Sequence, residues 1–141
     1  MKKKDLIKAL VVFALTDKTT HNKVVKLGVI TAKQAELIKA KTGFNLEGYE
    51  RIVDKSGINH TIKNHSNARI EAARGQIAVT EKDFELIPEI VQSNNIIFSG
   101  KNKTGKNCLL YEAKIGDTFY YVEEIRTGRK QLALQTMYKR K

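Results

Sequence analysis

The segment that decides the fold runs from Cys108 to Lys139 and reads CLLYEAKIGDTFYYVEEIRTGRKQLALQTMYK. It contains three segments rich in β-branched and aromatic residues, separated by short turn sequences at 115–117 and 127–130. Such compositions favour strands, and turns this short join strands that run antiparallel. A further strand is predicted at 96–98, followed by a flexible basic loop at 100–107. Together these segments predict an antiparallel β-meander of about four strands.

Helical patterns dominate the chain before this meander. Thr31 and Gln34 form a capping box, which predicts a helix ending at Thr42-Gly43. Further short helices are predicted at 46–52, from a Ser56 cap to about residue 65, at 67–74, and after a Thr80 cap, where Pro88 either kinks the helix or lies just inside its start. Two segments, 10–16 and 23–30, are predicted as strands, although a helix at 10–16 stays open. Helices followed by an antiparallel sheet indicate an α+β fold.

The charge of the chain is unbalanced. It has 26 Lys and Arg against 15 Asp and Glu over 141 residues, a net charge of +11. Such an excess favours a polyanionic partner, either nucleic acid or an anionic membrane surface, although a basic surface can also serve solubility alone. Asp5 and Lys8 interrupt the apolar run that follows the N-terminal lysines, and no segment reaches the roughly 20 apolar residues of a membrane helix. We therefore expect a soluble protein without a membrane partner.

Several kinds of chemical site are not supported by the sequence. Cys108 is the only cysteine, which excludes an internal disulfide and a four-cysteine zinc site and favours a buried thiol. The three histidines have no zinc-binding spacing, and no glycine-rich loop has the strand-to-helix context of a nucleotide site. We therefore expect neither a metal nor a cofactor. General acid–base chemistry remains.

Two histidines lie in the predicted helix that ends near residue 65. His60 and His65 are five residues apart, so on one ideal helix their side chains point roughly 140° apart. They share a face only if the helix breaks between them. Lys63 and Arg69 give His65 a cationic setting that suits phosphate, whereas His60 has the alternative of a structural hydrogen bond within the fold.

The predicted strands add polar groups. Side chains alternate between the two faces of a strand. One face of the strand at 118–126 is therefore predicted to carry Tyr120, Val122, Glu124 and Arg126. One face of the last strand is predicted to carry Leu132, Leu134, Thr136 and Tyr138. The simpler interpretation is ordinary edge-strand polarity. With the imidazoles, however, these groups match what RNA cleavage requires: proton transfer near neutral pH, cations for the phosphate and hydroxyls to position it.

Basic residues cluster in the same regions. Around the histidines, in the predicted loop at 100–107 and near the C-terminus, the predicted RNA-binding residues are Lys63, Arg69, Lys101, Lys103, Lys106, Arg129, Lys130, Lys139 and Arg140. Non-specific attraction to phosphate is the minimum that this clustering predicts.

Five short motifs in a fixed order carry a resemblance to a known superfamily. They are HTIKNH at 60–65, GQIAVT at 75–80, DFELIP at 83–88, YYVEE at 120–124 and LQTMY at 134–138. From about residue 57 to 138 the chain resembles the phage-associated branch of the barnase, EndoU, colicin and RelE-like ribonuclease superfamily. The resemblance implies helices packed on a four-stranded antiparallel sheet, with a metal-independent RNase site on the sheet face.

The resemblance also implies roles for individual residues. It ranks His65 first as the acid or base and His60 second, Thr136 as a phosphate contact, and Glu124, Arg126 and Tyr138 as further candidates. One departure is Ser66, because many such domains have a glycine directly after the second histidine. The implied division is 1–45 as a supporting element of the same globular unit and 46–141 as the nuclease domain.

Three functions follow as hypotheses. The first is a metal-independent endoribonuclease acting in the cytoplasm or delivered to the cytoplasm of a target cell. Members of the superfamily often act as prophage-encoded or delivered toxins, some countered by a cognate immunity protein, so RNA and such a protein are the expected partners. The second is a non-catalytic RNA- or DNA-binding domain on the same fold, and the third is a phage structural or accessory protein.

Overall fold

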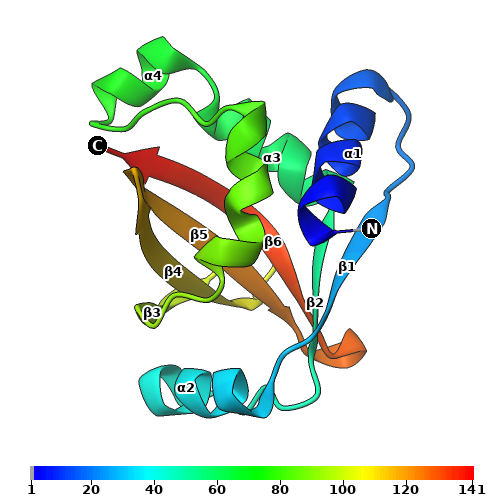
Figure 1. The fold of residues 1–141 in the computed structure, drawn as a ribbon, viewed down its shortest axis with the longest axis vertical. Coiled ribbons are helices and arrows are strands. Elements are labelled where there is room, and N and C mark those ends of the chain that lie inside the picture. The colour runs from blue at the N-terminus through cyan, green and yellow to red at the C-terminus, as the bar shows by residue number, and fades with distance from the viewer. Residues whose placement is uncertain (1) are drawn as a thin grey trace.

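A six-stranded mixed sheet forms the centre of the computed structural model, which describes residues 2–141 (Figure 1). The strands lie in the order β1-β2-β6-β5-β4-β3. Their bounds are Val24–Val29 (β1), Glu50–Asp54 (β2), Ile96–Lys101 (β3), Asn107–Ile115 (β4), Asp117–Arg126 (β5) and Gln131–Arg140 (β6). The helices are α1 (Lys3–Thr16), α2 (Ala32–Thr42), α3 (Lys55–His65), α4 (Ala68–Ala73) and α5 (Ile87–Ile90), with 3-10 helices η1 (Glu81–Leu86) and η2 (Thr127–Arg129).

The predicted C-terminal meander is confirmed. Strands β3, β4, β5 and β6 pair antiparallel in succession, and the α+β class is confirmed with them. The sheet is larger than four strands because β1 and β2 extend it: β1 pairs antiparallel with β2, and β2 pairs parallel with β6. The parallel contact joins segments about eighty residues apart, a pairing that local sequence patterns do not specify.

Two predicted elements have the wrong type. The strand predicted at 10–16 is part of α1, in which Ile7, Leu10, Val11 and Ala14 are buried at helical spacing. The helix predicted at 46–52 is instead a turn leading into β2. Leu46, Tyr49 and Ile52 are buried, and residues 50–52 pair with β1 and β6, so tertiary contacts overrule the local pattern.

Local capping rules describe most helix ends correctly. Thr31 and Gln34 form the predicted capping box of α2, which ends at Gly43 in the left-handed conformation with φ 84°. The segment after Thr80 forms η1, in which the backbone N–H of Thr80 donates to Asp83, and α5 then begins at Ile87 with Pro88 in its first turn. The cap of α3 is a correction: the Asp54 carboxylate, not Ser56, accepts the N–H of Gly57 at 2.9 Å.

Helix α3 lies beside β6 where β2 ends. Strand β2 pairs with β6 only from Gln131 to Ala133. Further along, the backbone N–H of Met137 donates to Oγ1 of Thr61 in α3 at 3.2 Å. A Cβ on Gly57 would overlap the carbonyl oxygen of Leu134, so glycine is required for this close approach. The contact brings the C-terminal end of α3 alongside the C-terminal half of β6.

A β-bulge in β6 decides which residues share a face. Val122 pairs with Thr136 but Glu123 pairs with Leu134, which leaves Gln135 as an extra residue. Leu134 and Met137 are buried on the core side, whereas Tyr138 stacks on Tyr120. The predicted grouping of Leu132 and Leu134 with Thr136 and Tyr138 is therefore wrong, because the bulge reverses the alternation.

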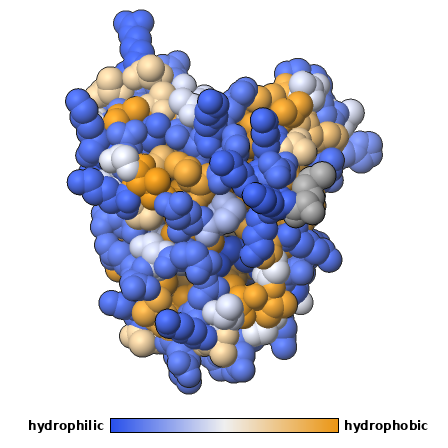
Figure 2. Space-filling model, in the orientation of Figure 1, coloured by the Kyte–Doolittle hydropathy of each residue, from blue (hydrophilic) through white to orange (hydrophobic). Residues whose placement is uncertain are grey.

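The two faces of the sheet have different surroundings. The hydrophobic core lies on one face, where α1, α2, α5 and η1 supply apolar side chains. The other face carries Tyr120, Val122 and Arg126, which are only partly buried. In Figure 2 hydrophilic side chains dominate the visible surface and apolar ones appear between them as separate patches. No helix within residues 2–141 has the length and apolarity needed to cross a membrane.

Candidate active site on the open sheet face

His65 is held by a buried carboxylate. Helix α3 ends at His65, and the side chain of Asn67 caps α4 by accepting the N–H groups of Arg69 and Ile70. This turn brings Glu71 back against the end of α3, where its Oε2 lies 3.2 Å from Nδ1 of His65. Glu71 has no solvent exposure, and its Oε1 accepts from Arg74 at 2.9 Å. The imidazole is therefore oriented by a carboxylate that is itself fixed.

Three aromatic rings line up next to this pair. The His65 ring centroid is 5.4 Å from that of Tyr138, which stacks on Tyr120 at 4.9 Å with 11° between the ring planes. The guanidinium of Arg140 lies over the Tyr120 ring at 5.5 Å. Partial burial and the neighbouring Glu112 carboxylate raise the pKa of Tyr120, so its phenol stays protonated at neutral pH. The imidazole, the two phenol rings and the guanidinium therefore form one continuous row beside the Glu71 carboxylate.

A polar network occupies the same sheet face further along the strands. Arg126 donates from Nε to Glu124 at 2.8 Å and from Nη1 to Asp54 at 3.2 Å. Burial lowers the pKa of Arg126, but the two carboxylates outweigh it and the net shift is upward. Asn102 donates to Glu124 and to Gln135. The charges of Glu124 and Arg126 are thus paired with each other within the fold.

His60 faces a different part of this surface from His65. Its exposed side chain lines an open groove with Lys101, Lys103, Glu124 and other side chains. A second groove shares Thr104 and Glu124 with the first and adds Lys106, Arg126 and Arg129. The two grooves form a cationic strip that a polyanionic chain could follow.

Comparison with family models decides the class of protein. A model described as phage-Barnase-EndoU-ColicinE5/D-RelE like nuclease3 matches residues 28–141. The chain belongs to this nuclease family. Comparison with curated proteins and with solved structures found no match. The family match extends over residues 28–45, which the sequence analysis assigned to the supporting element.

The predicted site residues of this phage-type nuclease fall into two groups on the sheet face. His65 and Tyr138 are in contact at one end, and His60, Glu124 and Arg126 line the grooves. The structure does not bring His60 and His65 into contact with each other or with a shared side chain among the described residues. The predicted 140° separation on one unbroken helix agrees with this arrangement.

Thr136 has an unusual environment for a predicted phosphate contact. Its Oγ1 is buried and has no hydrogen-bond partner among residues 2–141. A buried hydroxyl without a partner costs free energy. A phosphate oxygen would reach it only after a neighbouring side chain moves.

The predicted RNA-binding cations differ in their surroundings. Most are exposed: Lys63, Arg69, Lys101, Lys103, Lys106, Arg129, Lys130 and Arg140. Lys139 is buried, and its Nζ lies 2.9 Å from Asp83 and 3.4 Å from Asp117. The bulge at Gln135 turns Lys139 toward the core face, so its charge is neutralised inside the fold.

Sequence reasoning missed the residues that support the candidate site. Glu71 and Arg74 were not proposed, although an Asn67 cap followed by an acid in a short helix is a readable signal for a carboxylate near His65. Asn102 and Gln135 were missed because their contact depends on the bulge and on a turn far away in sequence. Within residues 2–141 no group of three or more His, Cys, Asp or Glu side chains forms a metal-binding cluster.

Proposed function

We propose that the protein is a metal-independent endoribonuclease that uses His65 as its general base. The observation that carries the proposal is the hydrogen bond between Nδ1 of His65 and the buried Glu71 carboxylate. Because a carboxylate only accepts, the proton of a neutral imidazole is held on Nδ1, and Nε2 carries the free lone pair. The same division of roles orients catalytic histidines in other hydrolases.

The proposed reaction is an internal transesterification of RNA. Nε2 of His65 takes the proton of the ribose 2′-hydroxyl, and the 2′-oxygen attacks the adjacent phosphorus. The bond from phosphorus to the 5′-oxygen breaks, and that oxygen takes a proton from a general acid or from water. The products are a 2′,3′-cyclic phosphate and a 5′-hydroxyl. DNA lacks the nucleophile, so the proposal predicts RNA selectivity.

The neighbouring groups have supporting roles in this proposal. The proposal assigns contact with a base of the RNA to the aromatic row of Tyr138 and Tyr120 beside His65. Exposed cations such as Lys101 and Lys103 attract the phosphate chain along the grooves. Glu124 and Arg126 maintain the shape of the sheet face, because their charges are already paired.

The proposal includes a biological setting. The phage-type family and the net charge of +11 support an RNA-cleaving toxin that acts in the cytoplasm, either of its own cell or of a target cell. A cognate immunity protein is the partner that such a toxin would need. Induced expression should then arrest growth, and His65→Ala should remove the arrest.

The direct test is cleavage of mixed cellular RNA by the purified protein in EDTA, with analysis of the product ends. Cyclic phosphate ends are expected from the wild type and not from His65→Ala. His21→Ala is the matched control, because His21 is exposed in a loop and its ring has a hydrogen bond only with Thr19 among the described residues. Intact RNA with retained, salt-sensitive binding would replace the proposal with the non-catalytic binding domain. Absence of binding at low salt would favour the phage structural protein.

A further inference from the structure

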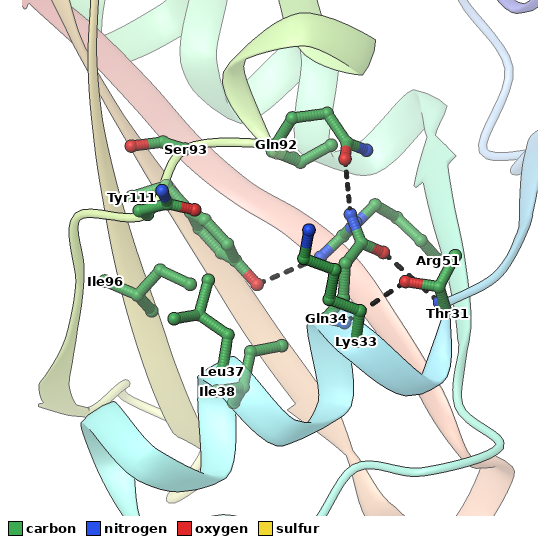
Figure 3. A pocket seen from close by; sticks show the side chains of 12 residues that line it. Thr31, Lys33, Gln34, Leu37, Ile38, Arg51, Gln92, Ser93, Ile96 and Tyr111 are labelled. Carbon is green, nitrogen blue, oxygen red and sulfur yellow. Dashed lines mark hydrogen bonds between the residues drawn. The ribbon is translucent and has the colours of Figure 1, made fainter.

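A cavity of about 190 Å³ lies between α2 and the core face of the sheet, among residues that the proposed nuclease does not use. Figure 3 shows Leu37, Ile38 and Ile96 gathered on one side of it, with Arg51 and Gln34 on the other. An apolar wall facing a few convergent polar groups is the usual composition of a small-molecule site. Among residues 2–141, no Asp or Glu lines the cavity.

Arg51 is the central polar group of this cavity. Its side chain is 5% exposed. Nε and Nη2 bind the Glu123 carboxylate at 2.7 and 3.2 Å, and Nη2 also donates to the Tyr111 hydroxyl at 3.0 Å. Burial lowers the pKa of Arg51, but Glu123 outweighs that effect and the net shift is strongly upward, so the guanidinium stays charged.

The Arg51 guanidinium has donors left over. Nη1 makes no hydrogen bond with any described residue, although a guanidinium carries five N–H donors. Buried donors normally have partners, because an unmade hydrogen bond to a charged group costs free energy. The described residues leave Nη1 of this nearly buried cation free, and it is reached from the cavity, where water or a ligand can accept its N–H groups.

The charge around the cavity selects the kind of acceptor. The Glu123 carboxylate offsets the charge of Arg51. The charge of Lys33 is not offset, so the site has an excess of about one positive charge. Thr31 caps α2 at the same place, so the positive end of the helix also faces the cavity. This excess matches a monoanion better than a dianion. A planar carboxylate also matches the fork of a guanidinium.

The volume limits the size of the ligand. An apolar cavity of about 150 Å³ is known to accept benzene. The space here therefore accommodates about one ring, or a branched aliphatic group, with a carboxylate attached.

We propose that this cavity binds a small organic carboxylate. The carboxylate accepts from Nη1 of Arg51 and from Lys33, and the apolar part packs on Leu37, Ile38 and Ile96. The proposal goes beyond the nuclease function and does not depend on it, because the cavity and the candidate active site lie on opposite faces of the sheet.

Two glutamines that line the site are hydrogen-bonded to each other. Nε2 of Gln34 donates to Oε1 of Gln92 at 2.8 Å (Figure 3). Both glutamines, together with Arg51, also line a second cavity of about 90 Å³. The two spaces therefore lie next to each other and share these side chains.

The test is a titration of the full chain with benzoate, followed by methyl and amide NMR. Saturable shifts are expected at Leu37, Ile38, Ile96 and the first turn of α2. Benzamide has the same shape without the charge, and its affinity should be lower than that of benzoate by about tenfold or more. Absence of saturable shifts overturns the proposal, and equal binding of benzamide overturns its anionic character.

Two variants locate the site without disturbing the Arg51 ion pair. Leu37→Trp fills the cavity and should abolish the benzoate shifts, and Lys33→Gln removes the charge at its mouth and should weaken binding severalfold. Lys39→Ala lies on the same helix outside the cavity and is the control that should bind as the wild type does. Thermal unfolding verifies that each variant is folded. Benzoate shifts that survive both Leu37→Trp and Lys33→Gln would place the binding elsewhere and refute the proposal.

Discussion

Nδ1 of His65 lies 3.2 Å from Oε2 of Glu71, a carboxylate with no solvent exposure. The two residues are on different helices, and Arg74 holds the second carboxylate oxygen at 2.9 Å. A buried carboxylate that is paired on both oxygens holds an imidazole in one orientation. In the proposed nuclease, Glu71 is therefore a positioning residue that acts through His65.

Glu71→Gln should lower the rate of RNA cleavage by about 10²-fold or more, because the amide no longer holds the imidazole in the required tautomer and stabilises its protonated form less. Binding of RNA should change little. Single-turnover cleavage beside RNA affinity separates the two effects, with the exposed Glu81→Gln as control. A wild-type rate and pH profile in a folded Glu71→Gln protein would exclude this role.

Tyr138→Ala should weaken binding of single-stranded RNA by about tenfold or more, whereas Tyr138→Phe should keep most of the affinity. The reason is that stacking needs the ring rather than the hydroxyl. Fluorescence anisotropy with a short oligoribonucleotide measures the difference. Equal losses of RNA affinity in both variants would show that RNA binding depends on the Tyr138 hydroxyl and not on its ring.

Lys101, Lys103, Lys106 and Arg129 should each contribute to the salt dependence of RNA binding. Replacing all four by Gln should reduce the slope of log affinity against log salt by up to about 1 for each RNA phosphate that is no longer neutralised. Lys139→Gln should leave the slope unchanged and instead lower the free energy of unfolding, because Asp83 and Asp117 lose their partner. The reverse pattern would contradict the burial of Lys139.

Gly57→Ala should destabilise the fold by about 1–3 kcal/mol, because the added Cβ overlaps the Leu134 carbonyl and pushes α3 away from β6. Gly128→Ala is the control, since a Cβ there meets no atom within 4 Å. Chemical denaturation measures both variants. Similar stability of the two would mean that α3 does not pack this closely.

Asp17 should make stability depend on pH in the acid range. Hydrogen bonds from Thr19 and the charge of Lys55 lower its pKa from 3.8 to about 2. A lowered folded-state pKa stabilises the protein above the unfolded value, and this contribution is lost as the pH falls from about 4 toward 2. The gap in unfolding free energy between wild type and Asp17→Asn should therefore close over that interval.

Denaturation at several pH values measures this gap. Asp5→Asn, at an exposed position of α1, controls for the loss of a negative charge elsewhere. A gap that stays constant down to pH 2 would contradict the lowered pKa of Asp17 and the contacts with Thr19 and Lys55 that cause it.

Local signals were enough for the elements whose ends are defined by short-range hydrogen bonds. The capping box of Thr31 and Gln34 and the turn at Gly116 involve residues a few positions apart, so sequence alone predicts α2 and the β4–β5 hairpin. The segment at 10–16 was ambiguous, because a continuous apolar run suits either a buried strand or a buried helix. Packing of α1 against η1 and α3 favours the helix over the strand for this segment.

The candidate site was predicted in part for the same reason. His65 and the sheet face that carries Tyr120 and Glu124 could be found from motif order and alternation along one strand. Glu71, Asn102 and the stack of Tyr138 on Tyr120 could not, because each contact joins segments across the fold.

The sequence by itself determined the α+β class, the antiparallel meander and the excess of positive charge, because these follow from composition, alternation and short turns. Only the tertiary structure decided the parallel pairing of β2 with β6, the bulge at Gln135 and the carboxylate behind His65. Each of these depends on contacts between residues distant in sequence, whose free energy is gained only when the whole sheet forms. The catalytic face proposed here therefore results from the fold and not from any single motif.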